Sequence, residues 1–297
     1  VVGYDKRFAS EHFAAAVAEV MAGNGIRTYL TQGATPTPVI SYSVVARKAA
    51  GAVNITASHN PPTDNGFKVR GPTGGAIDPS GLLEIEAAIP TASRVQQMEM
   101  EDALARGLVE VFDPAPAYIE QVKRLIDVEP IRQAGFTIVN DSMWGNGAGW
   151  FDRLIGGGRT RLIPLHDQRN PIFPEMSRPE PIRPNVDPCL AKVREVGAHI
   201  GIITDGDADR LGVVDEQGNF VDQLRVFALL AMYIFSVNFR KWGLPYLPTV
   251  GMFEPGAGQT FSQVAWHMVL PVATLSFGFI AGYSRYIRSA MLEALGQ

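Results

Sequence analysis

The feature that most constrains the fold is an alternation between strand-like apolar runs and helical periods. The run "AGAVNITAS" (50–58) is almost continuously apolar, which is typical of a strand covered on both faces of a sheet. Before it, the pattern predicts a helix over 9–24, a strand over 27–31 and a helix over 39–50. Strands that alternate with helices in this way indicate an α/β fold with a largely parallel sheet.

The same alternation continues along the chain. Helices are expected at 79–89, 115–126 and 187–197, a strand at 135–141, and a strand, loop and strand across 198–218. The most apolar stretch, 226–235, predicts a buried helix that opens a third α/β segment. In the first helix, the residues at helical spacing that are expected to form the apolar face are Phe13, Val17, Val20 and Met21. Length and pattern together predict consecutive α/β domains over 1–104 and 105–218, followed by a partial one over 219–297.

Composition narrows the classes of function. The net charge of −4 and the pI of about 5.8 argue against a nucleic-acid partner, since such proteins usually carry a basic surface. No run approaches the roughly 18 apolar residues that would suggest a membrane span. The single cysteine, Cys189, forms no disulfide within the chain and is expected to be a small core residue, which fits a cytoplasmic location.

An acidic loop follows the apolar run that ends at Ile203. It places Asp205, Asp207 and Asp209 at alternate positions, and three close carboxylates repel one another unless a cation neutralises them. Hard divalent cations take oxygen ligands, and Mg²⁺ commonly combines carboxylates with phosphate oxygens. The loop is therefore a candidate magnesium site.

Three other interpretations of this loop stay open. The first is a solvated acidic turn, the second is an EF-hand, and the third is the Asp-x-Asp motif of an aspartyl-nucleophile phosphatase. Counted from Asp205, an EF-hand would put its final ligand at Glu216, but Arg210 stands where that loop requires glycine, and the flanks predict strands.

A second polar loop follows the strand that ends near Ser58. A serine hydroxyl is a weak nucleophile unless a base or a charge activates it, and His59 and Lys68 are candidates for that role. The Asn65-Gly66 turn is expected to fold Lys68 back toward Ser58. The alternative is a plain hairpin with a capping serine and a solvated lysine. A serine that carried phosphate would supply the oxygens that a three-aspartate magnesium site lacks, so the two loops are expected to share one site.

Five segments together resemble the α-D-phosphohexomutases, the phosphoglucomutase and phosphomannomutase superfamily. "TASHNPPTDNGFKV" (56–69) resembles the phosphoserine signature of that family and "TDGDADR" (204–210) its magnesium loop. "GYDKRFAS" (3–10), "DSMWGNGAG" (141–149) and "PEPIRPN" (179–185) are similar to further family segments. The resemblance extends from residue 1 to about residue 235.

The resemblance implies a role for each matching residue. It implies that Ser58 is phosphorylated and both donates and recovers the phosphoryl group, with Lys68 as general acid or base and His59 assisting. It implies that Arg7 and Arg210 screen the phosphoryl charge. The implied ligands of Mg²⁺ are Asp205, Asp207, Asp209 and the Ser58 phosphate.

The implied enzyme is an intramolecular phosphotransferase, a Mg²⁺-dependent isomerase of carbohydrate metabolism. It would interconvert a hexose 1-phosphate and a hexose 6-phosphate through a bisphosphate, with glucose 1,6-bisphosphate or its mannose equivalent as activator. The small phosphosugar is its expected partner. "KVRGPTGG" (68–75) is closer to the glucose and mannose enzymes than to the glucosamine enzymes.

Departures from the family pattern are confined to the two ends. The resemblance implies a first domain that is truncated at its N-terminus, a partial third domain and an absent fourth domain. The sugar-recognition signature Gly-Glu-Glu-Ser-Gly is missing, and Ile280 stands where the family places a lysine after an apolar strand. The alternative function is therefore a non-catalytic or weakly hydrolytic remnant that binds sugar phosphate or metal.

Overall fold

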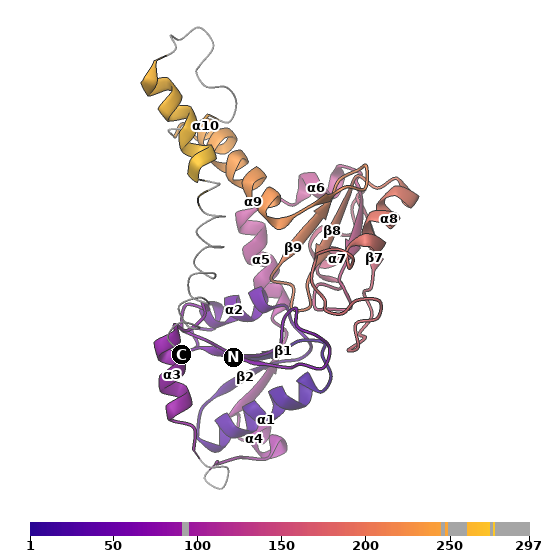
Figure 1. Cartoon of the computed structure of the whole chain (residues 1–297). Coiled ribbons are helices and arrows are strands. Elements are labelled where there is room, and N and C mark those ends of the chain that lie inside the picture. The colour runs from indigo at the N-terminus through magenta and orange to yellow at the C-terminus, as the bar shows by residue number, and fades with distance from the viewer. Residues whose placement is uncertain (91–94, 245–246, 249–259, 274–275, 277–297) are drawn as a thin grey trace, which may run out of the picture. The chain divides into compact units, whose positions relative to one another are not determined.

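Two five-stranded sheets form the frame of the first of two units, Val1–Phe220, in the computed structural model. The structure describes residues 1–90, 95–244, 247–248, 260–273 and 276. The strand orders are β4-β3-β1-β2-β5 and β10-β9-β8-β6-β7 (Figure 1). The first four strands in chain order take the same places in both sheets, so the expected recurrence of α/β segments is visible in the topology.

The first sheet is parallel except at one edge. Strands β1, β2, β3 and β5 run parallel, and β4 pairs antiparallel with β3. Its helices α1 and α4 lie on one face and α2 on the other (Figure 1). The bounds of the strands are Val2–Tyr4 (β1), Thr28–Thr31 (β2), Ala52–Ile55 (β3), Phe67–Arg70 (β4) and Val109–Phe112 (β5), and those of the helices are Ser10–Gly23 (α1), Thr37–Ala46 (α2), Pro79–Ala87 (α3) and Met100–Ala105 (α4).

The second sheet repeats this plan. Strands β6, β7 and β8 are parallel and β9 pairs antiparallel with β8. The bounds of the strands are Thr137–Asp141 (β6), Arg161–Leu165 (β7), Ile200–Thr204 (β8), Leu211–Val214 (β9) and Phe220–Val221 (β10), and those of the helices are Ala115–Leu125 (α5), Glu129–Gln133 (α6), Trp150–Ile155 (α7) and Asp187–Val196 (α8). On β6, Ile138 packs with the cluster of Val128 and Ile155, while Val139 packs on the opposite side with residues of α8. The period of two along a strand explains this split between two covered faces.

Burial confirms the expected strand over 50–58, because Ala52–Ile55 is buried at every position. Cys189 is also buried in the core on α8, as expected for a small core residue. The predicted apolar face of helix α1 is met in part, because Val17 and Met21 pack against the core while Phe13 is about half exposed. The fully buried residues of the helix are Ser10, Ala14, Ala18 and Ala22. A stripe of alanines lets the helix axis lie close to the sheet, so the small residues are buried most completely.

The first sheet extends beyond residue 104. Strand β5 falls in the expected second domain, 105–218, but it pairs in parallel with β2 from Thr28–Val109 to Thr31–Phe112. Weak local signals around 90–113 concealed both α4 and this strand, because their burial depends on partners distant in sequence.

The second unit, Val221–Gln297, is mostly helical in its described residues. Helix α9 (Gln223–Met232) continues through a π-helical segment (Tyr233–Asn238) into α10 (Phe239–Lys241), and residues 261–273 are also helical. The expected buried helix at 226–235 is a helix, but α9 and the π-helical segment contain no buried residue. The family places an apolar strand before the position of Ile280, whereas residues 264–273 are helical, and Ile280 itself lies outside the described residues. The assignment of 219–297 to a third α/β domain stays a prediction.

One buried ion pair sets a pH dependence for the second sheet. His166, just after β7, contacts Asp141 at the end of β6 with 2.8 Å between Nδ1 and Oδ1. The hydrogen bond to Asp141 raises the pKa of His166 against the opposing effect of burial. Because the folded pKa lies above the unfolded one, the pair stabilises fully below the unfolded pKa of about 6.5 and loses this contribution as pH rises through the folded pKa.

We therefore expect the free energy of unfolding of the wild type to exceed that of His166→Gln most at pH below about 6.5. The difference shrinks as pH rises further. Urea unfolding of both proteins across this range measures it, and the remaining histidines cancel in the comparison. A difference that did not change with pH would show that the pair carries no net charge interaction.

Candidate functional site

Ser58 lies in the loop between β3 and β4, three residues beyond the end of the strand. Its backbone adopts a left-handed conformation with φ of 52°, and its N–H donates to the Thr56 hydroxyl at 2.8 Å. The residue is buried. A non-glycine residue in this conformation costs energy, so the surrounding contacts must hold it there.

Arg7 supplies most of those contacts. It follows β1, is 1% exposed, and its guanidinium donates to the carbonyl oxygens of Ser58, Asn60, Pro61 and Asp64 at 2.6–3.0 Å. The charge of Arg7 is balanced by Asp5, with 3.3 Å between Nε and Oδ2. A planar fork of N–H donors is well suited to organising several carbonyl groups at once.

This arrangement adds a second role to the one expected for Arg7. The sequence resemblance implied that its charge screens the phosphoryl group, and that role stays a prediction. The hydrogen bonds from its guanidinium to the carbonyl groups of the serine loop also favour the left-handed conformation of Ser58.

The acidic loop lies between β8 and β9, so strands flank it on both sides. This excludes the EF-hand alternative, whose loop requires helical flanks. Asp205 and Asp207 are fully buried, which also excludes a solvated turn. The structure therefore places two of the three carboxyl groups where their charge needs a partner.

The serine loop and the acidic loop meet. The Ser58 hydroxyl donates to Asp205 Oδ2 at 3.2 Å, across 147 residues of sequence. Ligand oxygens of Asp205, Asp207 and Asp209 all lie within 4.8 Å of one another. The other oxygen of Asp205 accepts the backbone N–H groups of Asp209 and Arg210, both at 3.0 Å, which fixes the loop around this carboxylate. The expectation of one site built from two loops is met in the geometry of these residues.

The carboxyl groups differ in their electrostatics. Burial and the nearby charges of Asp207 and Asp209 raise the pKa of Asp205 well above its usual range. Burial and the charge of Asp207 also raise the pKa of Asp209. Burial opposes ionisation of Asp207 too, but the hydrogen bond from Thr37 and the charge of Lys68 hold its pKa below the usual value. The cluster thus carries fewer charges at equilibrium than three free aspartates would, and a cation would reverse this.

The residues present fit a hard divalent cation. Asp207 Oδ1 is buried and has no hydrogen-bond partner among the described residues. An unpartnered carboxylate oxygen in a buried site is costly, and it is the type of ligand that Mg²⁺ takes. Asp205, Asp207 and Asp209 are the residues that would hold the ion.

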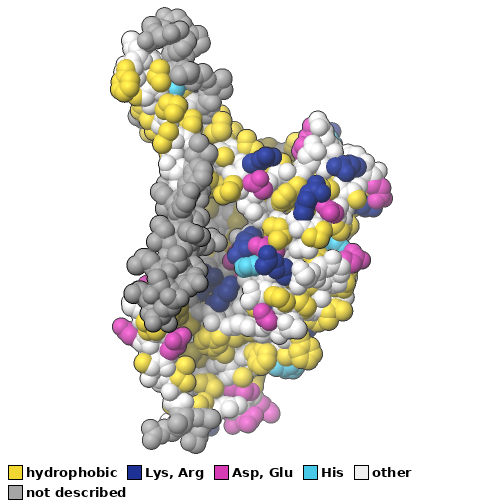
Figure 2. Space-filling model, viewed as in Figure 1, with side chains coloured by type: hydrophobic (Ala, Val, Ile, Leu, Met, Phe, Trp, Pro, Cys, Tyr) yellow, Lys and Arg dark blue, Asp and Glu magenta, His cyan; other side chains and the backbone are white. Residues whose placement is uncertain are grey.

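The basic residues expected at the site surround it. The Lys68 ammonium lies 3.6 Å from Asp207 Oδ2 and the side chain is 40% exposed, so it can also reach a ligand. Arg210 pairs with Glu180 at 2.8 Å, and Glu180 also pairs with Arg178. Basic side chains gather with a histidine and acidic side chains on the face of the first unit in Figure 2. The chain thus presents positive charge beside the carboxylates, where a phosphate would lie.

His59 lies next to the Ser58 hydroxyl, with 3.3 Å between Nδ1 and Oγ. Burial and the charge of Arg210 lower the pKa of His59, so the neutral imidazole is favoured near neutral pH. A neutral imidazole at this distance is able to accept or return a proton at Ser58 Oγ.

Three contributors to the site had no signal that sequence reasoning used. Thr37 opens helix α2, and its hydroxyl donates to Asp207 Oδ2 at 2.6 Å. Asn54, on β3, donates to that same hydroxyl. Asn146 donates to the Thr35 carbonyl at 2.7 Å, and its own backbone N–H binds the Gly206 carbonyl, so it connects the first sheet to the acidic loop. Asn146 lies in the segment 141–149 that resembles the family, but the resemblance gave it no role, and Thr37 precedes the helix that was expected at 39–50.

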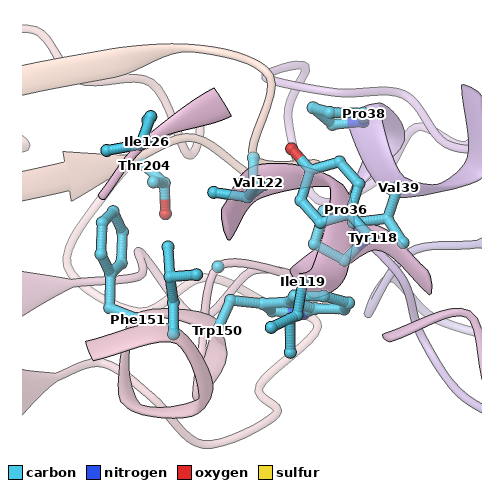
Figure 3. Close-up of a pocket in the computed structure, with 13 residues that line it drawn as sticks. Pro36, Pro38, Val39, Tyr118, Ile119, Val122, Ile126, Trp150, Phe151 and Thr204 are labelled. Carbon is cyan, nitrogen blue, oxygen red and sulfur yellow. The ribbon is translucent and has the colours of Figure 1, made fainter. Parts of the chain in front are cut away.

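A separate cavity of about 310 Å³ lies next to the acidic loop. Figure 3 shows its apolar walls, which come from α2, α5 and α7 and include Tyr118, Trp150 and Phe151. Its residues in the described part of the chain include no charged side chain. A sugar phosphate requires charged and polar partners, so this cavity does not suit that ligand, and the cluster around Ser58 does.

Two family models and several curated proteins match this chain. Residues 1–96 match the family model of phosphoglucomutase/phosphomannomutase alpha/beta/alpha domain I, and residues 116–218 match that of domain II. A probable phosphoglucosamine mutase of Pyrococcus furiosus is 37% identical over 241 residues, 79% of this chain and 49% of that protein. A phosphoglucomutase/phosphomannomutase of Thermococcus kodakarensis is 30% identical, over 80% of this chain and 51% of that protein.

A solved structure supports the same relationship. A putative phosphomannomutase from Thermus thermophilus superposes with a TM-score of 0.71 at 35% identity, covering 81% of this chain and 52% of that one. The chain thus spans about half the length of the curated relatives it matches.

The serine loop and the acidic loop pack so closely that a larger residue in place of Gly206 is expected to destabilise the protein. A Cβ at this position would lie 2.4 Å from the Ser58 carbonyl oxygen and 2.9 Å from Pro179 Cγ. A backbone oxygen cannot move aside cheaply, so Gly206→Ala must separate the loops. We expect a loss of about 1–3 kcal/mol in the free energy of unfolding, measured by urea denaturation.

Gly33→Ala is the matched control, because a Cβ there has open space around it and the residue does not need a left-handed backbone. It is expected to change the free energy of unfolding by no more than about 0.5 kcal/mol. Equal stability of the two variants would contradict the close approach of Gly206 to Ser58.

Proposed function

The chain belongs to the phosphoglucomutase/phosphomannomutase family, and we propose that it carries the phosphoryl-transfer half of a phosphohexomutase site, with Ser58 as the phosphate carrier. The observation that carries the proposal is the contact between the Ser58 hydroxyl and Asp205 within the cluster of three carboxyl groups. A phosphate on Ser58 would add oxygen ligands beside the unpartnered oxygen of Asp207.

The proposed reaction is the one that the family resemblance implies, and these residues are assigned to its steps. The bond from Ser58 Oγ to phosphorus breaks as a bond from a sugar hydroxyl to phosphorus forms. The proton of that hydroxyl passes to a general base, for which Lys68 is the candidate, and Ser58 Oγ regains a proton with help from His59. Transfer back to Ser58 from the other end of the sugar bisphosphate would complete an isomerisation.

Positioning and charge neutralisation do most of the work in phosphoryl transfer. Arg7 fixes the loop that carries Ser58, and Arg210 places positive charge beside it. Lys68 adds positive charge in its protonated form and accepts a proton in its neutral form. Bound Mg²⁺ would supply further positive charge to the phosphoryl oxygens.

The proposed substrate is a hexose phosphate, with glucose or mannose as the expected sugar. That expectation comes from the segment 68–75, whereas several relatives are named as probable phosphoglucosamine mutases. Glucosamine phosphate therefore belongs in any test of specificity.

A cytoplasmic location is also part of the proposal. Among the described residues, no helix is both long enough and apolar enough to span a bilayer.

Phosphorylation of Ser58 is the first test. After incubation with glucose 1,6-bisphosphate and Mg²⁺, we expect intact-mass analysis to show the gain of one phosphoryl group. Ser58→Ala is expected to show none. Ser80→Ala, which removes an exposed hydroxyl from the start of α3, is the matched control and keeps the gain. If the wild type gained no mass while a full-length relative did, the proposal would be wrong.

Turnover on sugars is the second test. Coupled assays with the 1-phosphates of glucose, mannose and glucosamine measure formation of the 6-phosphates, and release of inorganic phosphate is followed in parallel. We expect isomerisation of at least one sugar, dependent on the bisphosphate and lost in Ser58→Ala. Release of phosphate without isomerisation would favour the hydrolytic alternative, and calorimetric binding with neither reaction would favour a binding remnant.

A further inference from the structure

Thr37 connects the half of the site that carries Ser58 to the half that carries the carboxylates. It is the first residue of α2 and is buried. Its hydroxyl donates to Asp207 Oδ2 at 2.6 Å and its backbone N–H donates to the Asp207 carbonyl at 2.9 Å. Both contacts are made across 170 residues of sequence.

The direction of the side-chain hydrogen bond is set by Asn54. This buried residue of β3 donates its amide N–H to Thr37 Oγ1 at 2.7 Å. A hydroxyl has one proton to donate, and when its lone pair accepts from Asn54 that proton is directed to Asp207. The chain Asn54, Thr37, Asp207 thus runs from the first sheet to the acidic loop with every donor oriented.

These hydrogen bonds give the two carboxylate oxygens of Asp207 different surroundings. Oδ2 accepts from Thr37 and lies 3.6 Å from the Lys68 ammonium, whereas Oδ1 is buried without a partner among the residues that the structure describes. A carboxylate held through one oxygen has its other oxygen fixed in direction. The neighbouring carboxylates of the cluster lie close to it and offer no donor when they are ionised.

We propose that Thr37 is a positioning residue that holds Asp207 through Oδ2 and so directs Oδ1 into the cation site. This inference rests on the proposed function, because it assumes that the three aspartates bind a divalent cation. It adds that the cation site is complete only when the start of α2 is docked against the acidic loop.

The proposal predicts an effect on metal affinity that depends on the hydroxyl and not on the size of the side chain. Thr37→Val keeps the shape and the backbone hydrogen bond to Asp207 but removes the donor. Thr37→Ser keeps the donor and removes a methyl group. Loss of an outer hydrogen bond to a metal ligand typically weakens metal binding by about 10- to 100-fold.

The experiment titrates the full chain with Mn²⁺ and follows the free ion by electron paramagnetic resonance, a readout that needs no catalysis. Thr37→Val is expected to bind Mn²⁺ about 10- to 100-fold more weakly than the wild type, and Thr37→Ser within about threefold of it. Thermal unfolding without metal checks that each variant is folded. If Thr37→Val does not fold, Thr37→Ala takes its place and must show the same order.

The other outcomes separate the two claims. Equal Mn²⁺ affinity of Thr37→Val and the wild type would overturn this inference and leave the proposed function standing. Equal weakening in the serine and valine variants would also overturn it, because packing and not the hydroxyl would then set the affinity. Failure of the wild type itself to bind Mn²⁺ would overturn both the inference and the metal role in the proposed function.

Discussion

The repulsion among Asp205, Asp207 and Asp209 is the constraint on which the rest of the site depends. Ligand oxygens of the three lie within 4.8 Å of one another, and two of the side chains are fully buried. Such a cluster is stable only if protons, donors or a cation offset the charge. The chain supplies donors from the backbone of the acidic loop, the hydroxyls of Ser58 and Thr37, and the ammonium of Lys68.

Those donors come from two sheets, so the cluster also joins the two halves of the first unit. Loops at the ends of β3 and β8 lie so close that only a glycine fits at position 206. Asn146 and Arg169 add further connections, since Arg169 pairs with Glu11 and donates to the carbonyl groups of Lys6 and Arg7. The same topology in both sheets brings a loop followed by an antiparallel strand to each side of the site. The contacts that balance the charge of the cluster therefore also hold the two halves of the first unit together.

Much of the fold and of the site was predictable from the sequence, and each wrong or absent prediction has a physical cause. The strand before Ser58 was predictable because its apolar run needs two covered faces, and the acidic loop because three close carboxylates need protons, donors or a cation to offset their repulsion. The apolar face of α1 was predicted in part, because close packing on the sheet fully buries alanines, with Val17 and Met21 partly buried beside them and Phe13 exposed. Strand β5 was missed because its only strong feature is a partner distant in sequence.

Long-range hydrogen bonds were the least predictable part of the site. Nothing in the local pattern distinguishes Thr37 from an ordinary residue at the start of a helix, yet it binds Asp207 across 170 positions. Arg7 was expected to screen the phosphoryl charge, but a sequence does not reveal that four carbonyl groups also accept hydrogen bonds from its guanidinium. Motifs identified the charged residues and predicted that the two loops share one site, while the fold revealed the individual hydrogen bonds between them.

The central claim is that Ser58 and the acidic loop hold one metal ion and one phosphate between them. Electron–nuclear double resonance on the chain phosphorylated with glucose 1,6-bisphosphate and loaded with Mn²⁺ tests this directly. We expect a ³¹P hyperfine coupling to Mn²⁺ in the phosphorylated wild type and none in Ser58→Ala. Bound Mn²⁺ without a ³¹P coupling in the phosphorylated wild type would contradict it.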